Sequence, residues 1–389
     1  MDAQTVSLLF ALLRSAIRGD RLAEDELAAL TEERQRTLYA LANKHDVAPL
    51  VAAALENHGL LDAPTEVANS FSKQIHLAVY RYARLEYDLE ALCDALEAAE
   101  IPFIPLKGSV LRNDYPEPWM RTSCDLDILV RDADADRVAD LLVQQCGYKT
   151  EGKGRHDISL YSPCGNHVEI HYDLIEPGML DVSLDILHAV WDFTVPHEGC
   201  RYRRDMTDDM FYFYHLVHMA KHFVQGGCGI RPLVDLWILD HKDGIDLSRR
   251  EALIQRGELK AYADAVRRLT AVWFDGQPYD DLTRRMECFI LTGGVYGNSE
   301  NRVTMQQQKQ GGRLKYALSK IFLPYEILRF HYPILQKHRW LTPVMEVRRW
   351  GKLIFCGGAG RSVRELETTA RVSENQAADI KWLLENIGL

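Results

Sequence analysis

The sequence lacks the features that mark membrane-spanning, secreted and disulfide-bonded proteins. No uncharged apolar stretch reaches the roughly 18 residues of a membrane-spanning helix. The first 20 residues have neither the basic start nor the small-residue cleavage site of a signal peptide, and Arg14 interrupts their apolar run. The 8 cysteines are scattered and include no C-x-x-C pair. We therefore expect a cytoplasmic protein without a membrane span.

Positive charge is also scarce, since 46 Lys and Arg oppose 56 Asp and Glu and the net charge is -10. This balance does not favour nucleic-acid binding by the whole chain. Residues 313–371 are the exception, with 12 Lys and Arg against 4 Asp and Glu. This basic tail could bind RNA, an anionic acceptor or a membrane surface. We expect instead helices with an aromatic core and arginines at the surface.

The length of 389 residues allows two or three globular cores. Apolar residues recur at helical spacing over 3–99 and predict three to five helices, and helical periodicity returns after Asp205. Residues 293–312 are polar and glycine-rich and predict a mobile loop. The pattern predicts an α+β fold in three parts: an N-terminal helical region (1–95), a mixed α/β domain (96–205) and a C-terminal helical domain with the basic tail (206–389).

The middle block carries the strand signals. The runs IPFIPL, DLDILV, DISLYS and HVEIHYDL are short and rich in β-forming residues, and PCGN between the last two predicts a hairpin turn. The segment DADADRVADLLVQQ has helical periodicity. A small mixed sheet with helices beside it is therefore expected.

Two aspartates alternate with apolar residues in the run DLDILV. Strand side chains two positions apart lie on one face, so Asp125 and Asp127 are expected to point the same way. Two like charges on an otherwise apolar strand are costly unless a cation neutralises them. A helix cap or a surface pair of acids is the alternative, but the apolar flanks favour a metal site.

A third acid and a phosphate-binding element complete the pattern. Glu169 in the run VEIH repeats the alternation and is expected on a neighbouring strand, with Asp173 as the rival for its role. Upstream, Lys107, Gly108 and Ser109 follow an apolar run and begin a predicted helix. Such a glycine turn lets a phosphate approach the backbone closely, although a simple turn and helix cap is the alternative.

The order of these elements resembles the nucleotidyltransferase superfamily that includes DNA polymerase β and the aminoglycoside nucleotidyltransferases. The match is a Gly-Ser element, a D-x-D strand and a third acid. Over roughly 30–250 the chain is similar to a bacterial family of uncharacterised nucleotidyltransferases, through LKGSVLRNDYPEPWMRTSCDLDILV, VEIHYDL and HMAKHFVQGGCGIRPLVDLWIL. One departure stands out: the superfamily element is usually Gly-Gly or Gly-Ser, whereas here Lys107 precedes a single glycine.

The resemblance implies a polymerase-β-like domain and an enzyme that transfers a nucleoside monophosphate from an NTP, expected to be ATP, to a hydroxyl on a small molecule, a protein or an RNA. Asp125, Asp127 and Glu169 would hold two Mg²⁺ ions, or Mn²⁺, and Glu169 would also help to deprotonate the acceptor. Ser109 would contact the triphosphate, with Lys107 and Gly108 beside it. Pyrophosphate would leave after in-line attack on the α-phosphate.

The resemblance also extends to residues outside the acidic strands. Arg121 is expected to steady a phosphate, or to pair with a nearby acid. Four further residues would line the nucleotide or acceptor cleft: His218, Lys221, His222 and Asp235. His215, His218 and His222 share one helical face and could bind a transition metal, but core or cleft histidines are expected.

Two other kinds of function remain open at this point. The acids could persist in a catalytically silent nucleotide-binding module whose bound state a partner reads. Alternatively, the chain could be a helical interaction protein that acts through the basic tail, with the α/β block as a scaffold.

Overall fold

The computed structural model describes residues 2–174, 180–295, 297–309, 322–323, 325–355 and 374–389. The chain divides into two compact units: unit 1 comprises 1–221, 229–284 and 388, and unit 2 comprises 222–228, 285–387 and 389. The division into three domains that the sequence predicts, at 1–95, 96–205 and 206–389, remains a prediction.

Unit 1 begins with five helices, as expected: α1 (Ala3–Arg18), α2 (Glu24–Ala29), α3 (Glu32–Lys44), α4 (Ala48–Asn57) and α5 (Glu66–Ala98). Side-chain oxygens cap three of them, because Asp2, Thr31 and Thr65 each accept a hydrogen bond from a backbone N–H of the first turn. The apolar stripe of α1 reaches α12 (Lys260–Phe274), where Phe10 stacks on Trp273 with ring centroids 4.3 Å apart.

A five-stranded mixed sheet follows, with the order β1-β2-β5-β4-β3. Its strands are β1 (Phe103–Pro105), β2 (Asp125–Val130), β3 (Lys149–Lys153), β4 (Asp157–Tyr161) and β5 (His167–His171). β2 and β5 are parallel, and the other neighbouring pairs are antiparallel. The predicted hairpin turn joins β4 to β5, where Gly165 has a φ of 80°. Strand β3, which is exposed along its length, was not predicted.

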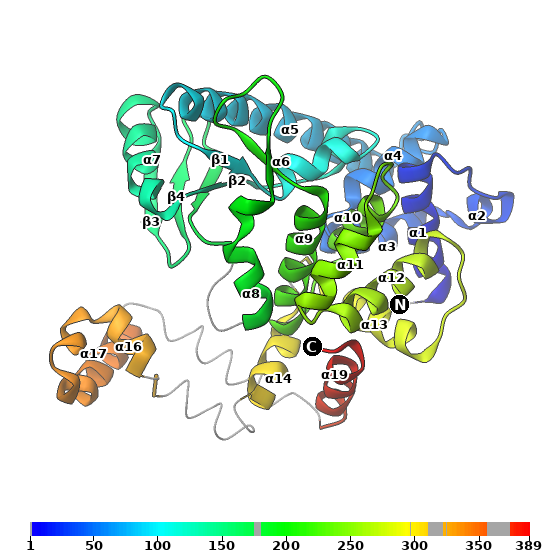
Figure 1. Ribbon diagram of the computed structural model, residues 1–389. Coiled ribbons are helices and arrows are strands. Elements are labelled where there is room, and N and C mark those ends of the chain that lie inside the picture. Colours follow the sequence, from blue (N-terminus) through cyan, green and yellow to red (C-terminus); the bar gives the residue numbers. More distant parts are fainter. Residues whose placement is uncertain (1, 175–179, 296, 310–321, 324, 356–373) are drawn as a thin grey trace. The chain divides into compact units, whose positions relative to one another are not determined.

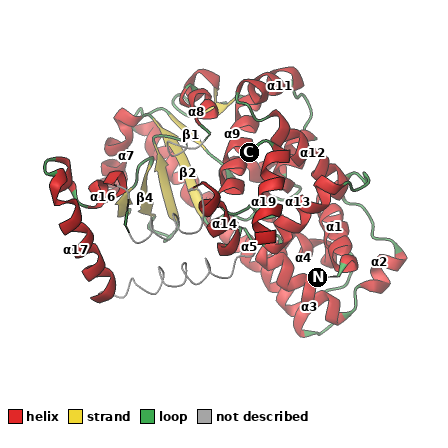
Figure 2. Ribbon diagram, turned by 90° about the horizontal axis from the view of Figure 1, so that it is seen from below, coloured by secondary structure: helices red, strands yellow, loops and turns green. Residues whose placement is uncertain are grey.

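One face of the sheet is buried under α5 and α7 (Asp132–Gln145), which Figures 1 and 2 show beside the strands. Leu126, Ile128 and Ile170 are fully buried in this core, together with side chains from both helices. Because strand side chains alternate, Asp125, Asp127 and Leu129 face the opposite side. The apolar positions of β2 thus fix the direction in which the acids point.

Short elements lie between β1 and β2: helix α6 (Gly108–Leu111) and the 3₁₀ turns Arg112–Asp114 and Pro118–Met120. After β5, unit 1 continues with α8 (Asp181–His188), a 3₁₀ turn (Val190–Phe193) and the hairpin of β6 (Thr194–Pro196) and β7 (Arg204–Met206). Helix α9 (Asp208–Val224) follows and ends in unit 2, and unit 1 then has α10 (Arg231–Asp240) and α11 (Leu247–Arg256) ahead of α12. Helix α13 (Asp281–Thr292) runs from unit 1 into unit 2.

Unit 2 contains α14 (Ser299–Lys309), α16 (Tyr325–His331), two 3₁₀ turns (Pro333–Gln336 and Arg339–Leu341), α17 (Thr342–Phe355) and α19 (Glu374–Ile387). The expectation of a loop over 293–312 is therefore wrong for most of that range. Asn298 caps α14 by accepting the Asn301 N–H at 2.6 Å, and Val303 and Met305 are buried. The buried side chains of Val303 and Met305, together with the Asn298 cap, stabilise a helix in a segment whose composition is polar.

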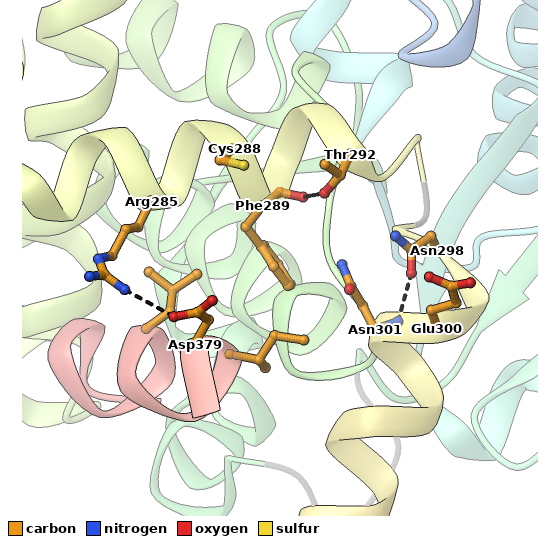
Figure 3. A pocket seen from close by; sticks show the side chains of 10 residues that line it. Arg285, Cys288, Phe289, Thr292, Asn298, Glu300, Asn301 and Asp379 are labelled. Carbon is orange, nitrogen blue, oxygen red and sulfur yellow. Dashed lines mark hydrogen bonds and ion pairs between the residues drawn. The ribbon is translucent and has the colours of Figure 1, made fainter. Parts of the chain in front are cut away.

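A cavity of about 410 Å³ lies within unit 2, between α13, α14 and α19. Figure 3 shows the ion pair of Arg285 with Asp379 at one side of it and Asn298 and Asn301 at the other. Phe289 lies between these polar groups. Arg285 and Asp379 thus neutralise each other's charge at the cavity wall.

Residues 313–321 and 356–371 of the basic tail lie outside the described residues. The remainder resembles the expected aromatic and arginine-rich helices. Leu328, Leu335 and Met345 form a small buried cluster, and the Arg339 guanidinium lies 4.5 Å from the ring centroid of Tyr325. Within the described part of the chain, every helix is too short or too polar to cross a bilayer.

Candidate active site

The register of two strands brings the acids together. β2 and β5 run parallel, with Asp127 opposite Glu169 and Leu129 opposite His171. All four side chains are on the sheet face away from α5 and α7, because their strand neighbours fill the core on the other face. The sequence expectation that Glu169 lies beside the D-x-D strand and faces the same way agrees with this register.

Asp127, Glu169 and His171 form a compact group of potential metal ligands. One ligand atom of each lies within 4.8 Å of the others, and no second such group of three occurs among the residues that the structure describes. His171 Nε2 lies 2.8 Å from Asp127 Oδ1 and 3.1 Å from Glu169 Oε2. Carboxylate oxygens and an imidazole nitrogen suit a divalent cation such as Mn²⁺, and the carboxylates alone suit Mg²⁺.

Lys107 supplies a positive charge at the same point. Its Nζ donates to Asp127 Oδ1 at 2.7 Å, so this oxygen contacts both Lys107 and His171. The Asp127 side chain is 2% exposed and that of Lys107 is 24% exposed. The backbone also links the two segments, because the Leu106 N–H donates to the Asp127 carbonyl at 2.9 Å. The ammonium therefore neutralises an almost fully buried carboxylate.

The pKa values reflect this crowding. Burial raises the pKa of Asp127, but Lys107 and His171 outweigh it and the net pKa is well below its usual range. Burial lowers the pKa of His171, yet its hydrogen bonds to Asp127 and Glu169 raise the net value. Burial and the nearby Asp127 charge both raise the pKa of Asp125. The group thus favours an ionised Asp127 and keeps strong negative charge at the strand pair.

The short helix α6 contains a buried polar atom without a hydrogen-bond partner in the described structure. Ser109 is buried, and its Oγ has no hydrogen-bond partner within the described residues. Gly108 is tightly enclosed, since a Cβ there would overlap Ser123 Oγ and lie 2.7 Å from Arg121 Nη1. A buried hydroxyl without a partner normally costs free energy. Its presence here agrees with the expectation that Ser109 contacts a ligand.

Asp125 lies on the same sheet face as Asp127, as expected, and opposite His167 in the register. It is not part of the group of three mutually close ligand atoms in the described chain. Parallel pairing puts Asp127, not Asp125, directly opposite Glu169, and His171 completes that group. Metal binding by Asp125 stays a prediction.

Arg121 and Asp235 form one buried ion pair. Arg121 Nη2 donates to Asp235 Oδ2 at 2.9 Å and Nε donates to Oδ1 at 3.2 Å, while the Tyr115 hydroxyl donates to Oδ1 at 2.7 Å. The exposed fractions are 9% for Arg121 and zero for Asp235. Both residues were expected to line the nucleotide site. The structure instead matches the alternative that Arg121 pairs with an acid.

The histidines of α9 fall into different surroundings. His215 is buried and its Nε2 lies 3.1 Å from the Pro232 carbonyl. His218 lies one turn after Tyr214, with ring centroids 6.1 Å apart, and Lys221 and His222 follow on the same helix. No group of three metal ligands was found on this helix among the described residues.

A comparison with protein-family models matches residues 31–275, more than half of the chain, to a family described as uncharacterised nucleotidyltransferases. The chain belongs to this family. It is therefore an enzyme of the nucleotidyltransferase class. Searches of curated proteins and of solved structures each returned no match. The matched range contains the sheet, the acidic group and the Lys107–Ser109 turn, and it ends one residue after α12.

Two residues close to the acidic group were not predicted from the sequence, His171 and Tyr214. His171 is two positions after Glu169, so strand alternation would have placed it on the same face. Tyr214 is four positions before His218 and thus shares its helical face. Its hydroxyl is buried without a hydrogen-bond partner among the described residues, and burial together with the nearby Asp127 and Glu169 raises the Tyr214 pKa, although Lys107 opposes this.

A cavity of about 310 Å³ lies beside the site on the nucleotidyltransferase sheet. Leu129 of β2 and Asp173, which follows the end of β5, contribute to its wall. Tyr172, His188 and Trp191 also line it. Asp173, the rival expected for the third acid, therefore belongs to this cavity, where it lies 3.4 Å from His188 Nε2.

Proposed function

We propose that the chain transfers a nucleoside monophosphate from an NTP, with ATP as the expected donor, to a hydroxyl acceptor and releases pyrophosphate. The observation that carries the proposal is the convergence of Asp127, Glu169 and His171 beside Lys107 and the unpartnered Ser109 hydroxyl. A cluster of carboxylates with a lysine and a hydroxyl that has no partner is an arrangement that suits a metal-bound triphosphate.

The proposed metal site consists of Asp127, Glu169 and His171, with Asp125 at its edge. Two Mg²⁺ ions are the expected occupants, and the imidazole makes Mn²⁺ a strong alternative. When bound, such ions would neutralise charge at the reacting phosphate and polarise it. We further propose that the sheet, with acids on the adjacent strands β2 and β5, is a polymerase-β-like catalytic domain.

The remaining roles belong to side chains of the protein. Ser109 Oγ and Lys107 Nζ would hold the triphosphate oxygens, with Gly108 allowing close approach. Glu169, which is 25% exposed, would accept the acceptor's hydroxyl proton. The acceptor oxygen then bonds to the α-phosphorus as the bond to the β-phosphate oxygen breaks, and pyrophosphate leaves.

We place the acceptor in the cavity beside the sheet. Leu129 of β2 contributes to its wall, which combines the carboxylates of Asp132 and Asp173 with the aromatic side chains of Tyr172 and Trp191. A volume of about 310 Å³ admits a small hydroxylated molecule or a single side chain of a protein. Helices after Asp205 would complete the choice of acceptor, as the sequence predicted, with His218, Lys221 and His222 as the candidates.

The test is transfer of label from NTPs labelled at the α-phosphate, screened over small-molecule and protein acceptors in Mg²⁺ or Mn²⁺. Labelled product and pyrophosphate release are expected, and Asp127→Ala should abolish both while the protein stays folded. Equal turnover by Asp127→Ala would exclude the assigned site. Tight NTP binding without turnover across the whole screen would favour the silent nucleotide-binding module.

A further inference from the structure

The backbone of Lys107 has a conformation that suits glycine. Its φ is 45° and its ψ is -119°, in a region where a side chain is strained. A residue with a Cβ persists in such a conformation only when its surroundings fix it there. The lysine is therefore held at a position where glycine would cost less, which points to a use for its side chain.

The ammonium group of Lys107 contacts the acidic group. Lys107 Nζ contacts Oδ1 of Asp127, a residue of the proposed metal group. The ammonium thus lies against the carboxylate that a divalent cation would also need. Two cations cannot both bind this oxygen closely without strong repulsion.

We propose that Lys107 is an exchangeable counter-cation. It holds the charge of Asp127 in the metal-free enzyme and moves to the triphosphate when a divalent cation takes its place. The inference rests on the proposed function, because it needs a metal-bound NTP at this site. In this proposal the Lys107 ammonium competes with the divalent cation for the Asp127 carboxylate. Lys107 therefore weakens metal binding in the absence of nucleotide and strengthens binding of the nucleotide.

Three observations support an exchange over a fixed ion pair. The Lys107 side chain is 24% exposed, whereas that of Arg121, which pairs with Asp235, is 9% exposed. Asp127 keeps a second partner in His171 when the lysine departs. Ser109 Oγ, two residues along the chain, is a buried hydroxyl with no partner in the described structure, and a phosphate bound to it would lie close to the lysine.

The experiment consists of two calorimetric titrations. The first measures binding of Mn²⁺ to the metal-free protein, and the second measures binding of a non-hydrolysable ATP analogue at saturating Mn²⁺. Lys107→Met should bind Mn²⁺ alone about 10-fold more tightly than the wild type, because the competing charge is gone. The same variant should bind the analogue about 10-fold more weakly, because a charge-assisted contact to phosphate is lost. A lysine with a structural role alone would not produce opposite signs.

The controls separate charge from folding. Lys107→Arg keeps a cation and should bind Mn²⁺ like the wild type. Lys149→Met removes an exposed lysine of the same sheet and should change neither affinity. Should Lys107→Met fail to fold, Lys107→Gly removes the ammonium while it accepts a φ of 45° without strain, and its Mn²⁺ affinity should rise in the same way.

The outcomes distinguish the exchange from the metal site on which it depends. Mn²⁺ affinity of Lys107→Met and Lys107→Gly that equals or falls below that of the wild type overturns the exchange and leaves the proposed function intact. Absence of Mn²⁺ binding in the wild type and in both variants, with and without the analogue, overturns the metal site and the exchange together.

Discussion

Two carboxylates in unit 1 are almost completely buried beside a cation, and they differ in every other respect. Asp235 is closed: Arg121 and Tyr115 occupy its oxygens, and neither member of the ion pair is more than 9% exposed. Asp127 is less enclosed: the side chain of its lysine is 24% exposed, and the hydroxyls of Ser109 and Tyr214 have no hydrogen-bond partner within the described residues.

The comparison shows how a buried charge can indicate either architecture or function. A closed pair satisfies its own hydrogen bonds and therefore has nothing left to bind a ligand. An open group keeps unsatisfied donors and excess negative charge, which a metal and a phosphate would satisfy. Substitutions at the two carboxylates should thus separate stability from activity.

The largest effect is expected at the open carboxylate. Asp127→Asn keeps the shape and removes the charge that would hold the metal, so turnover should fall by about 10³-fold or more. The unfolding free energy should fall by less than in Asp235→Asn, because the Lys107 side chain is more exposed than that of Arg121. Nucleotidyl transfer and urea denaturation on the same preparation check both statements; a large loss of stability would place Asp127 with Asp235 as a structural residue.

At the closed pair the pattern should reverse. Asp235→Asn leaves the Arg121 charge buried and should lower the unfolding free energy by about 3–5 kcal/mol. Arg121→Met should cost a similar amount. The double variant should be more stable than either single variant, since it leaves no unpaired charge. Urea denaturation measures the cycle; strictly additive losses would show that the pair is not coupled.

His171 sharpens the assignment of the open group. His171→Gln removes an imidazole from the metal group and should weaken Mn²⁺ binding by about 10- to 100-fold, whether the ring is a direct ligand or supports Asp127. His215→Gln, on the helix that carries no metal group in the described chain, is the matched control. Electron paramagnetic resonance of bound Mn²⁺ reports both affinities, and equal values would remove His171 from the site.

Ser109 tests whether the hydroxyl without a partner is kept for a ligand. Ser109→Ala breaks no hydrogen bond of the described structure, so the melting temperature should stay at or above that of the wild type. NTP affinity should nevertheless fall by about 10-fold, because a hydrogen bond to a charged phosphate is lost. Ser7→Ala, at an exposed position of α1, is the control and should change neither quantity. A fall in melting temperature without a change in affinity would contradict this role.

The smallest effect is a pH dependence with opposite signs at two histidines. Burial lowers the His171 pKa, but its carboxylate partners raise the net value, so its stabilisation is present below about 6.5 and is lost as pH rises through the raised pKa. Burial gives His215 a lowered pKa, so its contribution is present above about 6.5 and is lost as pH falls. Unfolding free energies of the His171→Gln and His215→Gln variants without metal, measured from pH 5 to 8, check the signs.

The sequence predicted the features of the site that depend on local residue patterns. Alternation in DLDILV and HVEIH was sufficient to place Asp127 and Glu169 on one face, since strand periodicity is a local property. The pair of Arg121 with Asp235 spans 114 positions and was not predictable from either residue's neighbours. Which acid stands opposite Glu169 depends on strand register, and register is set by the whole sheet.

The central claim is tested most directly by a crystal structure of the chain with Mn²⁺ and a non-hydrolysable ATP analogue. The account predicts anomalous scattering from Mn²⁺ bound by Asp127 and Glu169, with triphosphate oxygens at the metal and at Ser109 Oγ. Manganese and nucleotide bound elsewhere, with Lys107 still on Asp127, would contradict it.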